Sequence, residues 1–291
     1  MPAGVLYVVA TPIGNLEDIT IRALLVLREV SLIACEDTRQ TRKLLNRHSI
    51  GTATASFHRF NEDRAVPSLL QKLRSGKDLA LVSDGGTPSV SDPGFSLVRA
   101  CREQRIPVVP VPGPSALLAA LVGSGLPADR FSFFGFLPHR SGERRRLLES
   151  LHDRRETLVF FDSPRRVAGS LGEMAQILGD RPAAICREMT KVHEEFRLGT
   201  LAELAGQLRG STVRGEVTLV VAGAPPPEPC SADPDTLRAE VDAEVRKHGV
   251  SRRDAVRTVA LRRGLPRRDV YRTLKDSRER TGPGGGAGRP E

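Results

Sequence analysis

Cysteine is scarce in this chain of 291 residues, and the four that occur lie far apart and form no C-x-x-C pair. Such spacing argues against both a disulfide framework and a zinc site, so we expect buried thiols and no bound metal. The four are Cys35, Cys101, Cys186 and Cys230. Also missing are a run of 18 apolar residues and a charged N-terminal stretch followed by an apolar one. We therefore expect neither a membrane span nor a signal peptide, and a soluble, cytoplasmic protein.

Two common nucleotide-binding motifs are absent as well. The loop after the first apolar run contains no G-x-G-x-x-G, and Gly76-Lys77 has Gln71 where the first glycine of a phosphate-binding loop should stand. A conventional dinucleotide or nucleoside triphosphate site is therefore not expected.

Positive charge is unevenly distributed along the chain. There are 44 Lys and Arg against 35 Asp and Glu, a net charge of +9, and residues 237–280 alone hold 14 basic and 7 acidic residues, which supplies +7. A polyanion, nucleic acid first, is the partner that this distribution favours for the C-terminal region. An arginine-rich surface that is merely well solvated is the alternative.

The first half of the chain alternates between apolar runs and segments with helical spacing. Residues 5–10 and 79–82 are uninterrupted apolar runs, typical of strands covered on both faces, whereas residues 20–30 place apolar side chains at helical spacing. Short connections between such alternating elements predict a mostly parallel sheet with helices on both faces. We expect this α/β domain to span residues 1–125.

A glycine-rich loop, Ser83-Asp84-Gly85-Gly86-Thr87-Pro88, follows the apolar run 79–82. Ligands of open α/β sheets bind at such carboxyl ends, and glycines permit a close approach of backbone to ligand. The same residue types also make ordinary strand-to-helix turns, so that interpretation stays open. Other loops at predicted strand ends carry glycine or charge at residues 11–18, 36–39 and 112–115.

The second half is expected to form another α/β domain, residues 126–224. Predicted strands at 157–161 and 183–186 end in the charged segments Asp162-Ser163-Pro164-Arg165-Arg166 and Arg187-Glu188-Met189-Thr190-Lys191. Where two domains face each other, such strand ends line the cleft between them. Surface turns are the alternative interpretation of both segments.

Beyond the second domain the composition changes. Residues 225–235 are too rich in proline for a helix and are expected to form a linker. Residues 236–280 are predicted to form a basic, helix-turn-helix-like domain, in which Ser251 and Asp254 have capping-box spacing and Gly264 separates two helices with outward arginines. Residues 281–291 have the composition of a disordered tail.

Six short motifs together resemble the ribosomal RNA small subunit methyltransferase I family of the tetrapyrrole methylase superfamily, and they run in family order along nearly the whole chain. They are residues 10–20, Glu36-Asp37-Thr38-Arg39, residues 83–88 with 92–94, residues 111–115, Gly135-Phe136-Leu137-Pro138, and residues 187–191. The basic C-terminal helices also resemble the helical extension of that family. Two places differ: Gly85 stands where the family usually has alanine, and residues 162–166 replace a Glu-Ser-Pro-His-Arg pattern.

The resemblance implies two α/β domains of the tetrapyrrole methylase type with a cofactor cleft between them, followed by the small helical domain. It implies an enzyme that uses S-adenosyl-L-methionine for the 2′-O-methylation of a cytidine in the decoding region of 16S ribosomal RNA. The expected partners are 16S rRNA or the small ribosomal subunit, and a second copy of the chain in a homodimer. The alternatives are a methyltransferase for a small tetrapyrrole and an RNA-binding protein without enzymatic activity.

Strand-end loops supply the candidate site residues. For the cofactor they are Pro12, Gly14, Asn15, Asp84, Gly85, Gly86, Thr87, Pro88, Pro112, Gly113 and Ser115. We expect Asp84, or a backbone group, to accept a hydrogen bond from the cofactor's amino group. For RNA, Arg39 and Arg187 come from strand ends, and Arg252, Arg253, Arg267 and Arg268 come from the basic C-terminal helices.

A ribose hydroxyl is a poor nucleophile while it is neutral, so a base near the acceptor oxygen assists methyl transfer. The charged strand ends offer Glu36, Asp37, Glu188 and Lys191. We favour Lys191, kept neutral by burial, or Glu188 as this base, with Asp37 as a third catalytic candidate. Most of the acceleration is expected to come from positioning, which contributes up to about 7 to 11 kcal/mol in favourable cases.

Overall fold

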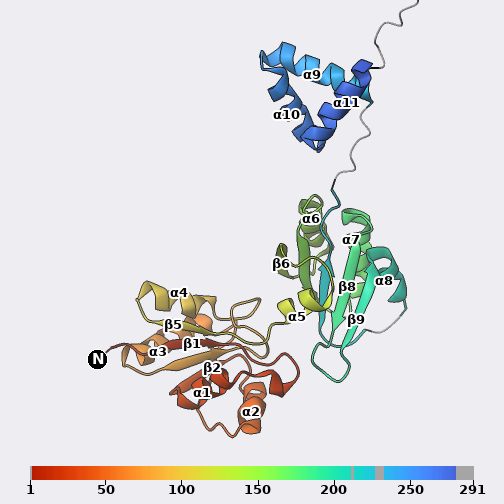
Figure 1. The fold of residues 1–291 in the computed structure, drawn as a ribbon. Coiled ribbons are helices and arrows are strands. Elements are labelled where there is room, and N and C mark those ends of the chain that lie inside the picture. The colour runs from red at the N-terminus through yellow and green to blue at the C-terminus, as the bar shows by residue number, and fades with distance from the viewer. Residues whose placement is uncertain (1, 211–212, 227–232, 280–291) are drawn as a thin grey trace, which may run out of the picture. The chain divides into compact units, whose positions relative to one another are not determined.

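The computed structural model describes residues 2–210, 213–226 and 233–279 of the chain. It divides the chain into two compact units, Met1–Ala224 and Pro225–Glu291 (Figure 1). The larger unit holds two lobes, each built around a five-stranded sheet. Cys230, residues 227–232 of the expected linker and the expected tail at 281–291 lie outside the described residues.

Five short parallel strands form the sheet of the first lobe, in the order β3-β2-β4-β1-β5. They are β1 (Leu6–Val9), β2 (Leu32–Cys35), β3 (Thr54–Ser56), β4 (Leu79–Val82) and β5 (Val108–Val111). All of β4, the central strand, is buried, as an uninterrupted apolar run predicts for a strand covered on both faces. The prediction of a parallel α/β sheet is confirmed.

Helices cover both faces of this first sheet. They are α1 (Ile21–Glu29), α2 (Thr38–Arg47), α3 (Glu62–Arg74) and α4 (Phe95–Glu103), and a 3-10 turn, η1, spans Leu16–Asp18. Strand β2 shows the alternation: Ile33 and Cys35 pack in the core with α1 and α2, while Ala34 packs in the core with α3 and α4. The thiols of Cys35, Cys101 and Cys186 are buried and free.

A mixed sheet in the order β6-β7-β10-β8-β9 forms the second lobe. Its strands are β6 (Phe131–Phe136), β7 (Thr157–Asp162), β8 (Pro182–Arg187), β9 (Glu195–Thr200) and β10 (Val217–Val221). The β6–β7 pair is parallel and the other neighbours are antiparallel. Helices α6 (Ser141–Ser150), α7 (Val167–Leu178) and α8 (Leu201–Gln207) share a core on one face, and α5 (Ala116–Gly123) packs on the other.

Two elements of the second lobe, α6 and β9, are not predicted by the sequence. Strand β9 lies at the edge of the sheet, and none of its residues is fully buried, so it lacks an apolar run. Helix α6 carries three consecutive arginines, and buried Arg144 stands where a helical pattern calls for an apolar side chain. Long-range packing, rather than local apolar periodicity, therefore defines both elements.

The smaller unit is a bundle of three helices, α9 (Pro234–His248), α10 (Arg252–Arg263) and α11 (Arg267–Glu279), where the sequence predicts the last two. Its buried side chains are Leu237, Val241, Ala255, Val256, Val259, Ala260, Val270 and Leu274. Gly264 ends α10 at a φ of +65°, in the left-handed region that favours glycine. Ser251 Oγ caps α10 by accepting from Asp254 N–H at 3.2 Å. The expected return bond of a capping box is replaced by donation from Ser251 Oγ to the Asp254 carboxylate at 2.5 Å.

The sequence predicts no membrane span, and the length and hydropathy of the helices bear on this. Across residues 2–210, 213–226 and 233–279, no helix is both long enough and apolar enough to span a bilayer.

Replacing Leu27 by Ala should destabilise the larger unit by about 2 to 5 kcal/mol, because Leu27 is fully buried in the core of the first lobe. Leu25 lies on the same helix with 48% of its surface exposed, so Leu25→Ala should change stability by no more than about 0.5 kcal/mol. Urea unfolding of both variants measures the difference. Equal losses of stability would contradict the assignment of the buried face of α1.

Candidate functional site

Two loops of the first lobe are joined by their backbones. Thr11 and Gly86 form an antiparallel bridge, in which each N–H donates to the other's carbonyl, at 2.9 and 2.8 Å. Thr11 Oγ1 also donates to Ser83 O at 3.0 Å. Gly86 has a φ of +86°, and a Cβ on Gly85 would lie 3.1 Å from Pro12 O, so both positions favour glycine. The loop after β1 therefore lies directly against the loop after β4.

Asp84 orders a third loop, the one that follows β2. Its Oδ1 accepts from Asp37 N–H at 2.9 Å. Asp37 in turn accepts from Arg39 N–H at 2.8 Å and holds the Arg39 guanidinium at 3.2 and 2.8 Å. These hydrogen bonds, the guanidinium's first, lower the pKa of Asp37 to about 2. Within residues 2–226 as described, Asp84 Oδ2 has no partner and is available to a ligand.

The two lobes touch where the loop after β1 meets the loop after β8. Asn15 N–H donates to Thr190 Oγ1 at 3.0 Å. A Cβ on Gly14 would collide with the side chains of Lys191 and Thr190. Glycine at position 14 therefore permits the contact. Glu188 and Thr190 have φ values of +48° and +64°, so the loop after β8 turns sharply at this point.

A cavity of about 880 Å³ lies between these loops inside the larger unit, which is within the usual range for small-molecule sites. Residues of both lobes line it. The first lobe contributes Thr11–Gly14, Leu16, Gln40, Thr41, Lys43, Leu44, Ser83–Thr87, Val90 and Asp92. The start of α5, which packs on the second sheet, contributes Ser115–Leu117. The rest of the second lobe contributes Phe136, Phe161–Pro164, Lys191 and Gly215–Thr218.

Most of the residues predicted for the cofactor line this cavity. They are Pro12, Gly14, Asp84, Gly85, Gly86, Thr87 and Ser115. Asn15, Pro88, Pro112 and Gly113 are not part of the lining. Gly113 has a different role, because a Cβ there would lie 3.1 Å from Ala10 Cβ. It lets the loop after β5 approach the end of β1.

Lys191 lines the cavity as predicted, but as a cation. Its Nζ lies 2.8 Å from Glu188 Oε1 and 3.2 Å from Glu216 Oε2. Burial favours the neutral amine, but the two carboxylates outweigh that effect and raise the pKa of Lys191. Hydrogen bonding to Lys191 is also the main reason why the pKa of Glu188 is lowered. The geometry therefore does not support a neutral Lys191 as the base, and it makes Glu188 a weak one.

Carboxylates on the first-lobe side of the cavity have raised pKa values. Burial is the largest cause for both Asp84 and Asp92, and nearby negative charge adds to it. Burial, then the charges of Asp92 and Asp84, also raise the pKa of Glu36. A raised pKa makes Asp84 and Asp92 stronger bases than an ordinary aspartate. Although these carboxylates gather here, the described residues contain no group of three or more His, Cys, Asp or Glu arranged to hold a metal ion.

The arginines predicted to contact RNA differ in their surroundings. Arg187 is half-buried and donates to Glu195 at 2.9 Å, which makes it part of an internal ion pair. Arg252 likewise donates to Asp242 at 3.0 Å. Arg39 is held by Asp37 with its side chain 87% exposed, and Arg268 lies 3.8 Å from Asp269 with its side chain 90% exposed. Arg253 and Arg267 are exposed on α10 and α11.

The second-lobe wall contains residues to which the sequence assigns no role. Phe136 and Phe161 line the cavity, and their rings meet edge to face with centroids 5.4 Å apart. Asp162 is 2% exposed, and its Oδ1 accepts from Ser163 N–H at 2.8 Å and from Arg166 at 2.9 Å. The signal for Phe136 was its place in a family motif, whereas Asp162 stands where the sequence departs from the family pattern.

The fold and the two-lobed cavity define the class of protein. The chain matches the model of the Tetrapyrrole (Corrin/Porphyrin) Methylases over residues 5–205. Among solved structures it is similar to diphthine synthase, with a TM-score of 0.60 and 15% identity over 75% of this chain and 90% of that one. It is also similar to uroporphyrin-III-C-methyltransferase from Thermus thermophilus, with a TM-score of 0.54 and 23% identity over 75% and 94% of the two chains. These two likenesses concern the fold alone.

Closer relatives narrow the class. Ribosomal RNA small subunit methyltransferase I of Mesorhizobium japonicum is 46% identical, with 97% of this chain and 95% of the relative aligned. The protein of that name from Halalkalibacterium halodurans is 43% identical over 92% and 93%. That from Thermotoga maritima is 48% identical over 220 residues, which are 76% of this chain and 99% of the relative. The chain therefore belongs to the ribosomal RNA small subunit methyltransferase I family of the tetrapyrrole methylases.

Asp92→Asn should raise the Tm at pH 7. The pKa of Asp92 is higher in the folded protein than the ordinary aspartate value of about 3.9, so the folded state binds the proton more tightly and ionisation of Asp92 opposes folding. The gain should appear as the pH rises from about 3.9 through the raised pKa, and should vanish below this window. Thermal unfolding at pH 4 and pH 7 measures it.

The control for this experiment is Asp37→Asn. The pKa of Asp37 is lowered to about 2, so its carboxylate stabilises the fold above the ordinary pKa and loses that effect as the pH falls through the lowered one. The substitution should lower the Tm at pH 7. An equal change in Tm at both pH values for Asp92→Asn would contradict the raised pKa.

Proposed function

We propose that this protein transfers a methyl group from S-adenosyl-L-methionine to the 2′-oxygen of a cytidine in the decoding region of 16S ribosomal RNA. The observation that carries the proposal is the extent of the match to ribosomal RNA small subunit methyltransferase I, which reaches 97% of this chain and 95% of the Mesorhizobium japonicum relative. Five of the six motifs that resemble the family contribute residues to the lining of the cavity; Glu36-Asp37-Thr38-Arg39 does not.

The cavity fits the proposed cofactor in size and in chemistry. S-adenosyl-L-methionine carries a positive amino group and a positive sulfonium, and Asp84 and Asp92 place carboxylates in the lining. Asp84 Oδ2 would accept from the amino group. Gly85 and Gly86 let the backbone come close to a ligand, and Ile13, Val90 and Leu117 supply apolar surface. The bound cofactor would supply a methyl group that is already activated by its sulfonium.

The residues of the chain then have to hold the ribose and take its proton. Lys191, kept cationic by Glu188 and Glu216, would pair with an RNA phosphate or with the developing charge on the 2′-oxygen. Asp92 also lines the cavity, and burial raises its pKa, so its carboxylate is the group that would accept the proton.

The helical unit would add affinity for RNA rather than chemistry. The alignment with the Thermotoga maritima relative spans 220 residues and covers 99% of that relative. This length is close to that of the larger unit alone, Met1–Ala224. In this chain α10 exposes Arg253 and Arg257, which are four positions apart and therefore share one face of the helix. Exposed arginines on one face favour contact with phosphates in any sequence context.

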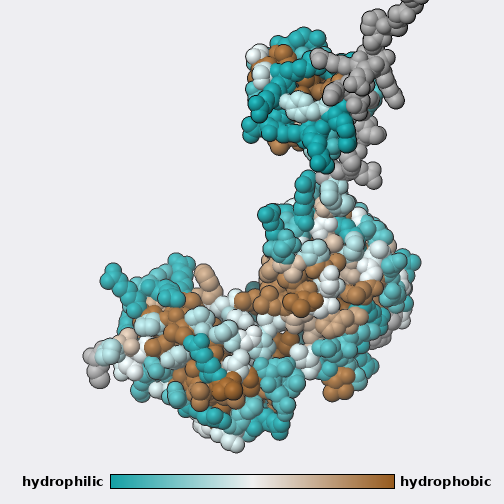
Figure 2. Space-filling view, in the orientation of Figure 1, coloured by the Kyte–Doolittle hydropathy of each residue, from teal (hydrophilic) through white to brown (hydrophobic). Residues whose placement is uncertain are grey.

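A homodimer is the proposed assembly. Helix α5 exposes Leu118 (51%) and Val122 (76%), and the edge strand β9 exposes Leu198 (60%). The two elements are neighbours, because a Cβ on Gly123 would collide with the ring of Phe196 on β9. Figure 2 shows hydrophobic surface over α5 and β6. An exposed apolar patch of this kind is typical of a protein interface.

A labelling experiment tests the proposed function. Small ribosomal subunits from cells that lack this protein are incubated with the protein and with cofactor labelled in the methyl group. Label is expected on the 2′-oxygen of a cytidine in 16S rRNA. Absence of transfer would support a binding protein without enzymatic activity, and label in a tetrapyrrole but not in rRNA would support the small-molecule alternative. Either result would overturn the proposal.

Cofactor binding is tested separately, through stability. S-adenosyl-L-methionine at about 100 times its Kd should stabilise the wild type by about 2.7 kcal/mol, and Asp84→Ala should lose that gain. The matched variant Asp37→Ala should keep it, because Asp84 Oδ1 accepts from the backbone N–H of Asp37 and not from its side chain. If Asp84→Ala binds the cofactor with wild-type affinity, the assignment of this loop is wrong.

The dimer is tested by light scattering. The wild type should show a mass near twice the chain's 31.6 kDa, and the double variant Val122→Glu/Leu198→Glu should show the mass of one chain. Charge placed in an apolar interface opposes association because it must be desolvated. Leu261→Glu, at a position 85% exposed on α10, should leave the mass unchanged. A monomeric wild type would refute the proposed assembly.

A further inference from the structure

Phe136 is exposed in a way that the fold does not require. It is 60% exposed, and its ring lines the cavity while resting edge-on against Phe161. Phe161 in turn meets Phe133 edge to face, with centroids 4.9 Å apart. One end of this aromatic row is packed inside the lobe and the other is open to the cavity. A large aromatic ring gains free energy when it is covered, and that gain is unrealised at Phe136.

A β-bulge is what turns Phe136 to this side. In the parallel pair β6–β7, Phe133 lies opposite Val159, and Phe136 lies opposite Phe161. Three steps along β6 therefore match two along β7, so β6 holds one extra residue. In an unbulged strand Phe136 would share a face with Phe134, whose ring stacks on Phe160 in the core. The extra residue moves it to the face of Phe133 instead.

Gly135 makes the bulge possible. Its φ is +65°, in the left-handed region, and a Cβ there would lie 3.0 Å from Ser91 Oγ on a loop of the first lobe. Any other residue would be strained in its backbone and tight against that neighbour. Bulges are frequent next to active sites, where they redirect a side chain, and here the redirected side chain is Phe136.

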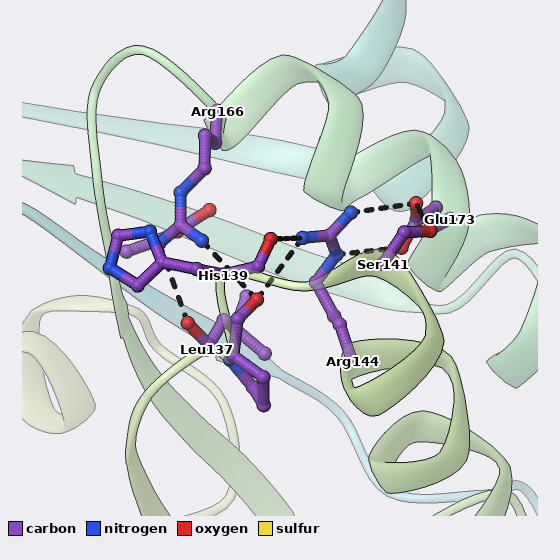
Figure 3. A network of polar contacts seen from close by, with 8 residues as sticks. Leu137, His139, Ser141, Arg144, Arg166 and Glu173 are labelled. Carbon is purple, nitrogen blue, oxygen red and sulfur yellow. Dashed lines mark hydrogen bonds and ion pairs between the residues drawn. The ribbon is translucent and has the colours of Figure 1, made fainter.

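The chain that follows Phe136 is held by two arginines (Figure 3). Leu137 N–H donates to Phe161 O at 2.9 Å and Leu137 is buried. Arg166 donates to the carbonyl oxygens of Leu137 at 3.4 Å and Pro138 at 3.2 Å, and Arg144 donates to Pro138 O at 3.1 Å. These contacts fix the backbone directly after the ring.

Each of these arginines is neutralised by a carboxylate. Glu173 binds Arg144 through both oxygens, at 2.6 and 2.7 Å, and Asp162 binds Arg166 at 2.9 Å. Arg144 is 9% exposed and Asp162 2%, and such buried charges are retained in a fold only when they are paired in this way. A rigid frame of charged groups therefore surrounds the backbone that presents one exposed aromatic ring.

We propose that Phe136 is the stacking platform for an unpaired nucleobase of the RNA substrate, an inference that rests on the proposed function. Proteins recognise RNA mostly through bases that have left their stack and lie on aromatic side chains. The cavity that Phe136 lines is also lined by Lys191, so it offers an aromatic face for a base and a positive charge for a phosphate. Arg144 and Arg166 are positioning residues for this platform.

The test compares variants that separate the aromatic face from apolar bulk. Phe136→Ala and Phe136→Leu should lower kcat/KM for the RNA roughly 5- to 150-fold, the equivalent of about 1 to 3 kcal/mol of stacking, whereas Phe136→Tyr and Phe136→Trp should stay close to wild type. Phe131→Ala removes an exposed aromatic residue from the same strand and should leave the kinetics unchanged. The Kd of S-adenosyl-L-methionine and the oligomeric mass should be the same in all variants.

Three outcomes would overturn the inference. Wild-type kinetics for Phe136→Leu would mean that an apolar side chain of similar bulk is sufficient. Weaker cofactor binding, in proportion to the loss of activity, would assign the ring to the cofactor's adenine. A change in oligomeric mass would assign the ring to a protein interface. Equilibrium binding of a single-stranded RNA with 2-aminopurine in place of a base gives a second readout, because stacking quenches its fluorescence. If the wild type transfers no methyl group, the proposed function is wrong. In that case, quenching of the 2-aminopurine fluorescence by the wild type but not by Phe136→Leu would still support the role of Phe136 as a stacking platform.

Discussion

The backbone contact between Thr11 and Gly86 is the constraint on which the rest of the site depends. Two hydrogen bonds bring the loop after β1 against the loop after β4, at a distance that a Cβ on Gly85 would disturb. With these loops joined, Asp84 reaches the N–H of Asp37 and orders the loop after β2. Short contacts between distant segments thus create the first-lobe wall, while a second oxygen of Asp84 stays available for a ligand.

The opposite wall depends on strand order. Strand β10 lies between β7 and β8 and is antiparallel to both, with Val217 paired to Asp162 on one side and to Arg187 on the other. The start of β10 therefore meets the ends of β7 and β8 at one edge of the sheet. This is why Glu216, which precedes β10, reaches Lys191, which follows β8, at 3.2 Å. The charge state of Lys191 is a consequence of the sheet topology.

How far the sequence predicts this arrangement depends on the range of the interactions involved. Uninterrupted apolar runs such as Leu79–Val82 mark buried strands, and the glycine loops at their ends follow directly, so the first lobe and much of the cavity wall can be anticipated. The ion pairs of Lys191 and Arg187 cannot, because they join residues brought together by an antiparallel sheet. Nor can the outward turn of Phe136, because a one-residue bulge leaves no mark in the apolar pattern of Phe131–Phe136.

Net charge also overstates the surface that a polyanion would meet. In the helical unit Arg252 pairs with Asp242 at 3.0 Å, Arg262 with Glu244 at 2.7 Å, and Arg263 with Glu240, so the acidic residues of α9 neutralise one side of α10. An arginine engaged in this way must share or break its ion pair before it binds phosphate. Arg253 and Arg257 are exposed one turn apart on α10. The exposed arginines, Arg253 and Arg257 on α10 and Arg267 and Arg268 on α11, rather than the whole charge of the segment, are therefore the groups that would meet a polyanion.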